Sequence, residues 1–569
     1  SVFTNLDISG DIDVDGTTNL DAVDIDGAVN IADNVTMAST NPILDLLADS
    51  NNDATLRLRE SGTGIVGAEF IYDGGDNALY LKIGNNSANT ALKIARDDGS
   101  LSTPTAGTSN VRFGVNAGNS IASGGNYNTV VGDEAGTALT TGDYNVGVGY
   151  SALTANTTGA SNTAMGYNAL DANTTASNNT AVGKSALAAN TTGTGLVAVG
   201  TNALDANTTA SNNVGIGLNA AGATTTGASN IAIGTNSLLQ NTTGALNVAV
   251  GTYALNANTT AANNTAVGHS ALTANTTGSE NVAIGAQAGD AITTGANNIS
   301  IGYMALGAET TGGRSVAIGR NALLVQNFTG DELPYNVGVG YGAGAAVTTG
   351  TINTLIGGLA GDALTTGNSN VAVGYLSLSA DTTGDRSTAI GHQALAAQNF
   401  TSNTDTYNVA VGYNAGVANT TGSQNTFIGG LSGTATTTAN NITSVGYKSL
   451  SANTTGTQNV AVGSLTLDAN TTANNNTAVG HAALTDNTTG SENVAVGTSS
   501  LFTNTTGTNN VGLGYNALNA NTTASYNVAI GRQSLAENTD GTNNTAVGAY
   551  ALAVATTPDG NTAIGRATL

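Results

Sequence analysis

The chain has 569 residues and a formal net charge of −24, from 37 acidic and 13 basic side chains. Only 9% of its residues are charged, 76 are Gly and none is Cys, whereas about 25% of the residues in a typical globular domain are charged. This composition excludes a heptad coiled coil, a basic nucleic-acid-binding protein, a disulfide framework and a thiolate metal site. No segment approaches about 18 consecutive apolar residues, so no transmembrane helix is predicted.

The N-terminal part of the chain is predicted to hold two β segments. Residues 1–41 alternate apolar side chains with Asp and Gly, which favours short strands and turns in a stalk or attachment region. Residues 42–104 are predicted to form a small antiparallel β domain. Its five strands are expected at residues 43–47, 54–59, 68–72, 78–83 and 91–94.

Residues 105–569 consist of one internal repeat, which predicts an all-β, parallel β-solenoid. A pattern of the form Asn-[Val/Thr]-Ala-[Val/Ile]-Gly, followed by Ala-Leu and Asn-Thr-Thr-Gly, recurs around 27 anchor glycines from Gly114 to Gly565. Of the 26 intervals between them, 23 are 17 residues long. Each interval is expected to be one coil, because a Gly-containing turn every 17 residues would break any helix.

The residues before each anchor glycine predict a short strand with two different faces. The first and third residues before it are apolar or Thr, as in Val182 and Thr180, and the residue between them is usually small, as in Ala181. Successive side chains of a strand point to opposite faces, and a strand without a polar face is typical of burial on both sides. We therefore expect the small-residue face to be buried between subunits of a homotrimer.

Two further columns of the repeat predict how the coils stack. Asn stands four residues before most anchors and seven after many, as in Asn162 and Asn173, which indicates ladders of stacked amides. Most coils carry Leu four residues after the anchor. In five coils Gly replaces this Leu and the seventh residue becomes bulky, which indicates one shared core position; those seventh residues are Ile121, Leu139, Ile292, Val347 and Leu364.

The repeat resembles the head repeat of trimeric autotransporter adhesins through Asn281-Val282-Ala283-Ile284-Gly285 and its equivalents. The resemblance covers about 460 residues and implies a left-handed β-roll and a trimer, although coils in that family are shorter. The N-terminal segments resemble modules of bacteriophage tail fibres. Such fibres often carry a self-cleaving chaperone domain after similar repeats, so cleavage after Leu569 and truncation are both consistent with the resemblance.

Two insertions of four residues each are the most distinctive local signal for binding. They begin with Gln326-Asn327-Phe328-Thr329 and Gln398-Asn399-Phe400-Thr401, and each ends with Tyr-Asn, at Tyr335 and Tyr407. They are 72 residues apart, so a parallel stack should bring both to one face. One interpretation is a tolerated longer loop. The other is an exposed receptor contact made by Phe328, Phe400, Tyr335 and Tyr407.

A second candidate contact surface is the variable column directly after the anchor glycines. It holds Tyr, Arg and all three His side chains, with the candidates His269, His392, His481, Arg320 and Arg532. We expect these side chains to be exposed. The alternatives are a solvated ladder or a stripe that contacts a glycan or receptor. The three His residues are many coils apart, so no shared metal site is expected.

The sequence predicts a structural fibre and no enzyme. No catalytic residues, cofactor or metal site is predicted, and the sparse acidic residues of the repeats argue against a polysaccharide depolymerase. The leading interpretation is a virion tail fibre or similar extracellular appendage for host attachment. The expected partners are two further copies, other tail or baseplate proteins, and a glycan or protein on the host surface, with neither nucleic acid nor membrane insertion. A bacterial cell-surface adhesin fragment is the alternative, and an ice-binding solenoid is a weaker one.

Overall fold

A computed structural model describes residues 54–59, 66–73, 78–83, 90–95, 101–102, 107–330 and 332–568. These residues form two units, Ser1–Leu101 and Ser102–Leu569, and the described residues contain strands and turns but no helix. Residues 1–41, with their predicted stalk repeats, lie outside the described residues, as does the strand predicted at 43–47. No helix of the described residues is long and apolar enough to cross a membrane.

The first unit holds a five-stranded sheet in the order β1-β2-β3-β4-β5. Strands β1 (Ala54–Arg59), β2 (Val66–Asp73), β3 (Ala78–Ile83) and β4 (Thr90–Ala95) pair antiparallel in sequence order. This agrees with four of the predicted strands. A short strand, β5 (Leu101–Ser102), completes the sheet and was not predicted.

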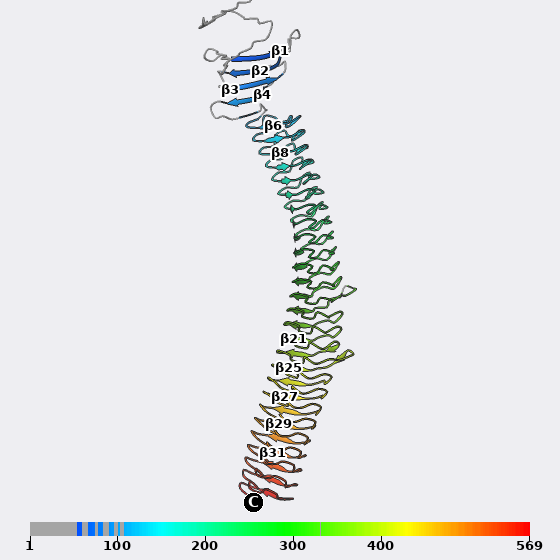
Figure 1. Ribbon diagram of the computed structural model, residues 1–569, viewed down its shortest axis with the longest axis vertical. Coiled ribbons are helices and arrows are strands. Elements are labelled where there is room, and N and C mark those ends of the chain that lie inside the picture. Colours follow the sequence, from blue (N-terminus) through cyan, green and yellow to red (C-terminus); the bar gives the residue numbers. More distant parts are fainter. Residues whose placement is uncertain are drawn as a thin grey trace, which may run out of the picture. The chain divides into compact units, whose positions relative to one another are not determined.

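The second unit is a parallel β-solenoid of 27 turns, most of them 17 residues long (Figure 1). Each turn contributes one three-residue strand to a continuous parallel ladder, in which every strand pairs in register with the strand of the next turn. The ladder consists of β6 (Val111–Phe113), β7 (Thr129–Val131), β8 (Val146–Val148), β9 (Thr163–Met165), β10 (Thr180–Val182), β11 (Val197–Val199), β12 (Val214–Ile216), β13 (Ile231–Ile233), β14 (Val248–Val250), β15 (Thr265–Val267), β16 (Val282–Ile284), β17 (Ile299–Ile301), β18 (Val316–Ile318), β19 (Val337–Val339), β20 (Thr354–Ile356), β21 (Val371–Val373), β23 (Thr388–Ile390), β25 (Val409–Val411), β26 (Thr426–Ile428), β27 (Thr443–Val445), β28 (Val460–Val462), β29 (Thr477–Val479), β30 (Val494–Val496), β31 (Val511–Leu513), β32 (Val528–Ile530), β33 (Thr545–Val547) and β34 (Thr562–Ile564).

Hydrogen bonds between adjacent coils continue around the turns as well as along the strands. The amide of Gly183 donates to the carbonyl of Met165 in the preceding coil, and that of Leu170 donates to Ala186 in the following one. The anchor glycines stack directly on one another. A Cβ on Gly183 would lie 2.5 Å from the carbonyl oxygen of Gly200, and its φ of 135° is a value that other residues rarely adopt. This close approach explains why every coil keeps Gly at the anchor.

The two strand faces are the reverse of the sequence-based expectation. The middle residue is buried in every ladder strand except β6, whereas the two flanking residues are half-buried or exposed. The small-residue face therefore lines the interior of its own coil, and the prediction that it is buried between subunits is wrong. The physical reason is space, because a 17-residue coil encloses room for Ala in the strand and one Leu opposite it.

The outward strand face is consequently an apolar stripe, defined here as the first and third strand residues of the 27 coils. Every one of these residues is Val, Ile, Leu, Met, Phe or Thr, and none is charged. Ile216, Ile284 and Ile356 expose 37%, 41% and 39% of their surface. The stripe is continuous from β6 to β34.

The predicted compensation between Leu and the seventh residue is confirmed. All five substitute residues are buried, and a Cβ on Gly289 would lie 2.9 Å from the Cδ1 atom of Ile292. A further form of compensation was missed. Two more coils have Gly in the Leu column, Gly416 and Gly433, and the ring of Phe427 in β26 fills both spaces. Cβ atoms on these glycines would lie 2.6 and 2.3 Å from that fully buried ring.

The two Asn columns form ladders of different kinds. Seven residues after the anchor, the amides bond to one another, as Asn173 Nδ2 donates to Asn156 Oδ1 at 2.8 Å. Four residues before the anchor, the amide mainly bonds backbone. Asn145 accepts the N–H of Asn162 at 3.0 Å and donates to the carbonyl of Gly159 at 2.9 Å. The Asn four residues before the anchor thus joins its own coil to the next one mainly through backbone groups.

Candidate functional site

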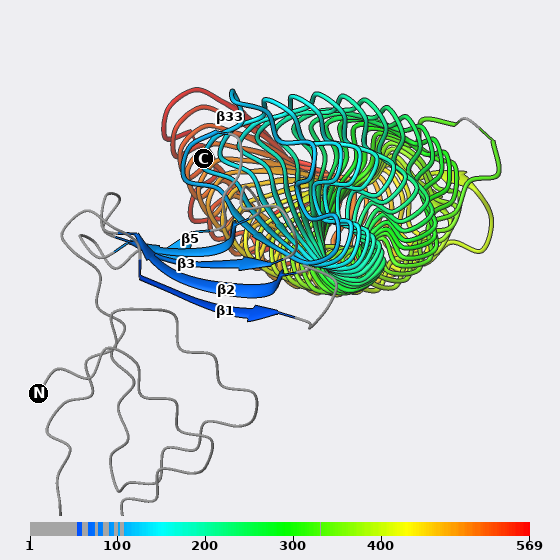
Figure 2. The ribbon, with the colours of Figure 1, turned by 90° about the horizontal axis from the view of Figure 1, so that it is seen from above.

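The two insertions form loops that project from the same side of the stack, in green and yellow-green (Figures 1 and 2). Their phenylalanines are not exposed. Phe328 and Phe400 retain 3% and 8% of their surface, whereas Tyr335 and Tyr407 expose 48% and 52%. The expectation that Phe328 and Phe400 offer exposed contact surface is wrong, because both rings anchor the loops against the solenoid.

A buried carboxylate holds each loop in place. Glu309 lies in the coil before the first insertion and is fully buried. It accepts hydrogen bonds from the backbone N–H groups of Gly312, at 2.7 Å, and Phe328, at 3.2 Å. The side-chain amide of Gln326 donates to it at 2.9 Å and also to Ser315 Oγ at 2.9 Å.

The second insertion repeats this arrangement residue by residue. Gln398 donates to Asp381 at 2.6 Å and to Ser387 Oγ at 2.7 Å, and the N–H of Phe400 donates to Asp381 at 3.2 Å. Burial raises the pKa of Asp381, and the bonds from Gln398 and from backbone N–H groups oppose that rise. These donors offset part of the cost of burying the Asp381 carboxylate.

A sequence signal for these clusters existed. Glu309 and Asp381 stand where most coils have the seventh-position Asn, and Gln326 and Gln398 stand there in the next coil. Ser315 and Ser387 replace the other conserved Asn of the repeat. These three departures from the repeat occur together twice, once beside each insertion.

An arginine covers the exposed tyrosine of each loop. The guanidinium of Arg314 lies 5.7 Å from the ring centre of Tyr335 and donates to its hydroxyl at 2.6 Å. Arg386 lies 5.8 Å from the ring centre of Tyr407 and forms an ion pair with Asp405. Both pairs are favourable cation–π contacts at the surface.

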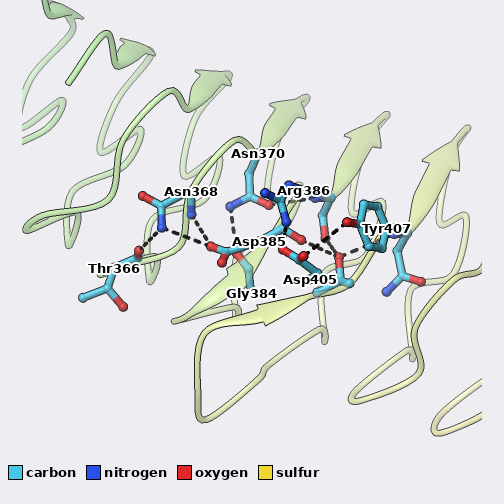
Figure 3. Close-up of polar contacts among 11 residues, drawn as sticks. Thr366, Asn368, Asn370, Gly384, Asp385, Arg386, Asp405 and Tyr407 are labelled. Carbon is cyan, nitrogen blue, oxygen red and sulfur yellow. Dashed lines mark hydrogen bonds and ion pairs between the residues drawn. The ribbon is translucent and has the colours of Figure 1, made fainter. Parts of the chain in front are cut away.

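Around Arg386, polar side chains bond to one another (Figure 3). Asp385 accepts the backbone N–H of Asn368 at 2.6 Å, and Tyr407 donates to Asp405 at 3.2 Å. Beneath them, β22 (Gly384–Asp385) pairs parallel with β24 (Thr404–Asp405). The second loop is therefore held to the preceding coil by both backbone and side-chain contacts.

The Tyr, His, Lys and Arg side chains of the column after the anchor glycines are exposed, as predicted. His269, His392, His481, Arg320 and Arg532 are all exposed. His392 stacks between Tyr375 and Tyr413, with ring centres 5.6 and 5.3 Å apart. Because these rings stack along the axis, they cover each other's faces.

The arginines of this column also pack against tyrosine rings of neighbouring coils. Arg320 lies 5.7 Å from the ring centre of Tyr303, and Arg532 lies 5.8 and 5.6 Å from those of Tyr515 and Tyr550. No ring contact involves His481 among the described residues. The structure does not bring the three His residues together, and no group of three or more His, Cys, Asp or Glu side chains in the described part is placed to hold a metal ion. A solvated ladder accounts for the column better than a platform for sugar stacking does.

Four aspartates five residues after their anchors lie in unfavourable surroundings. Burial raises the pKa of each, and backbone N–H groups oppose the rise; they are Asp171, Asp205, Asp290 and Asp362. One carboxylate oxygen of Asp171, Asp290 and Asp362 is buried without a hydrogen-bond partner. Other residues of this column donate to carbonyls of the coil below, as Asn256 does to Asn236 at 3.0 Å and Asn519 to Ser499 at 3.1 Å. The groups that face this column are therefore backbone carbonyls, which accept hydrogen bonds, whereas an ionised Asp needs donors.

Replacing these four aspartates with Asn should stabilise the solenoid at pH 7. The raised folded-state pKa means that the ionised form is penalised in the fold, so the penalty is present at neutral pH. It disappears as the pH falls through the folded-state pKa toward the unfolded value of about 3.9. Because solvent screens these half-exposed groups, we expect a small gain at each site, below about 1 kcal/mol. Thermal melting of both proteins at pH 7 and pH 4 should show a gain that shrinks at pH 4. A control variant should lose the same number of charges at the exposed carboxylates Glu280, Glu492, Asp540 and Asp559, and an equal gain in that control would contradict the explanation.

Comparison of the chain with models of known protein families and with curated proteins finds no match.

Proposed function

We propose that this chain is the structural shaft of an extracellular fibre, assembled from parallel copies along the apolar stripe. The 27 coils stacked at about 4.8 Å correspond to a solenoid about 130 Å long. With the two outward residues about 7 Å apart, the stripe covers on the order of 900 Å². A stable protein interface buries about 800 Å² on each partner, so a stripe with this footprint is long enough to form one.

The stripe is the single observation that carries this proposal, and the resemblance to trimeric adhesin heads supplies the number of copies. In this arrangement the outward Val, Ile and Thr side chains meet at the fibre axis. The Tyr, Arg and His column lies beside this interface, and the insertions project from the fibre. The left-handed coil implied by the same resemblance remains a prediction.

Within this proposal, a virion tail fibre that recognises a host surface is the leading assignment. The Asp–Gly segments before residue 42 resemble tail fibre modules, which favours it over the second candidate, a bacterial surface adhesin. Electron microscopy of particles labelled with an antibody against the chain tests the choice. Label on the tail of a virion supports the first assignment, and label on a bacterial envelope supports the second.

Ice binding is disfavoured by the Thr-Thr pairs of the repeat. The first Thr of a pair is half-buried and its hydroxyl bonds to the next coil, as Thr276 Oγ1 donates to the carbonyl of Thr293 at 3.1 Å. Only the second, such as Thr277, is exposed. The pairs therefore present one column of Thr hydroxyls and no flat two-column face.

Charges placed on the stripe should separate the copies without unfolding them. The triple variant Ile216→Lys, Ile284→Lys and Ile356→Lys puts three ammonium groups on positions that are already partly exposed. We expect it to be monomeric by light scattering, with an unchanged circular dichroism spectrum. The matched control places lysines in the exposed Thr column of the same coils, with Thr209→Lys, Thr277→Lys and Thr349→Lys, and should still assemble. If the stripe variant still assembles to the wild-type mass, the apolar stripe is not the interface between copies.

A further inference from the structure

The two insertions differ at the surface beside their Arg–Tyr pairs. Next to the first insertion lies an open cleft of about 190 Å³, whose lining includes Ala296, Asn297, Gly313, Arg314, Glu332 and Leu333. Its volume falls below the roughly 300–1,000 Å³ of pockets that hold drug-sized ligands. The cleft is suited to a single small unit of a larger molecule.

At the second insertion, the equivalent positions carry polar side chains that bond to one another. Four coils further on, Ala296, Gly313 and Leu333 correspond to Asn368, Asp385 and Asp405. Asn368 bonds to Asp385, and Asp405 pairs with Arg386. The same loop framework thus carries polar side chains that are already paired at one insertion and an open cleft at the other.

The open cleft contains Arg314, which forms no ion pair with another described residue, and one carboxylate, Glu332, in its lining. Among the described residues, the one side-chain hydrogen bond of Arg314 goes to the hydroxyl of Tyr335. A guanidinium has five N–H donors in a planar fork, which matches a carboxylate in two parallel bonds. The chain carries a net charge of −24, but the screening length of about 8 Å at physiological salt means that the charges in the cleft itself, Arg314 and Glu332, act most strongly on a ligand.

We propose that this cleft binds a carboxylated saccharide unit, such as a uronic acid residue of a surface polysaccharide. Arg314 receives the sugar carboxylate, the Leu333 side chain and Ala296 contact the apolar ring face, and Glu332 and the amide of Asn297 bond to hydroxyl groups. This inference rests on the proposed role in surface attachment and names the ligand class for it. The second insertion, with Arg386 already paired, serves as the internal reference that does not bind.

The test uses the full chain and two small probes, methyl β-D-glucuronide and methyl β-D-glucoside. Ligand-observed NMR titration should show specific binding of the glucuronide, weaker binding or none of the glucoside, and weaker glucuronide binding in higher salt. Leu333→Asp copies the Arg–Asp pair of the second insertion and should weaken glucuronide binding at least tenfold. Leu333→Asn is the matched comparison, equal in size to Asp but uncharged; it removes only the apolar contact, so it should weaken glucuronide binding less than Leu333→Asp does. Leu333 is 44% exposed, so neither change disturbs the core, and circular dichroism should be unchanged for both.

Arg314→Gln gives a second, independent variant and should also abolish glucuronide binding. Equal binding of glucuronide and glucoside, retained binding in Leu333→Asp, or no binding to the wild-type protein would overturn the proposal. Light scattering on the same samples separates this result from a failure of the fibre proposal. Assembly without glucuronide binding rejects the cleft alone, whereas a monomeric wild-type chain rejects the fibre.

Discussion

Phe427→Ala should be the most damaging single change in the solenoid core, with an expected loss of about 3–5 kcal/mol in unfolding free energy. The ring is fully buried and occupies the space that Leu side chains fill in other coils. Its removal leaves a cavity bordered by Gly416 and Gly433, neither of which can supply atoms to fill it. Urea unfolding monitored by circular dichroism measures the loss.

The repeat itself provides a rescue for this variant. Adding Gly416→Leu and Gly433→Leu restores the common coil, with Ala in the strand and Leu four residues after the anchor. Leu adopts φ near 50° at this position in other coils, as Leu170 and Leu255 do, and the two glycines have φ of 57° and 60°. We expect the triple variant to recover most of the lost stability. A triple variant less stable than Phe427→Ala alone would show that the core position is not shared.

Gly251→Ala should have the second large effect, through the backbone stack. Gly251 has a φ of 136°, and a Cβ there would lie 2.4 Å from the carbonyl oxygen of Gly268. The strained backbone alone costs about 1–3 kcal/mol, and the overlap forces two coils apart. Because each coil contacts only its neighbours, we expect faster amide hydrogen exchange in the coils around β14 and β15.

Gly358→Ala is the matched control for the anchor substitution. Gly358 follows an anchor, lacks a positive φ, and a Cβ there would approach Tyr375 at an ordinary 3.4 Å. Its effect should be within about 0.5 kcal/mol of wild type. Comparable destabilisation by both substitutions would mean that glycine composition, and not the anchor stack, explains the result.

Much of the fold was predictable because the repeat columns report constraints that every coil shares. Coil length, strand position, the anchor turn and the Leu compensation all follow from residues that recur in register. Which strand face points into the coil could not be predicted, because Ala181 and Val182 both fit an apolar pattern. Only the narrow interior of a 17-residue coil decides that Ala181 points inward.

The insertions show where sequence reasoning on single residues fails. Phe328 and Phe400 were interpreted by type as exposed aromatic contacts, but their burial depends on Glu309 and Asp381 one coil earlier. The open cleft could not be predicted either. It depends on comparing Leu333 with Asp405 across four coils and on knowing that Arg314 and Arg386 face those positions.

Light scattering of the intact chain tests the central claim that copies associate along the apolar stripe. The account predicts a trimer, with a mass three times the 55.7 kDa of one chain, and a monomer for the variant with lysines at Ile216, Ile284 and Ile356. A wild-type chain that remains a stable 55.7 kDa monomer at micromolar concentration would contradict it.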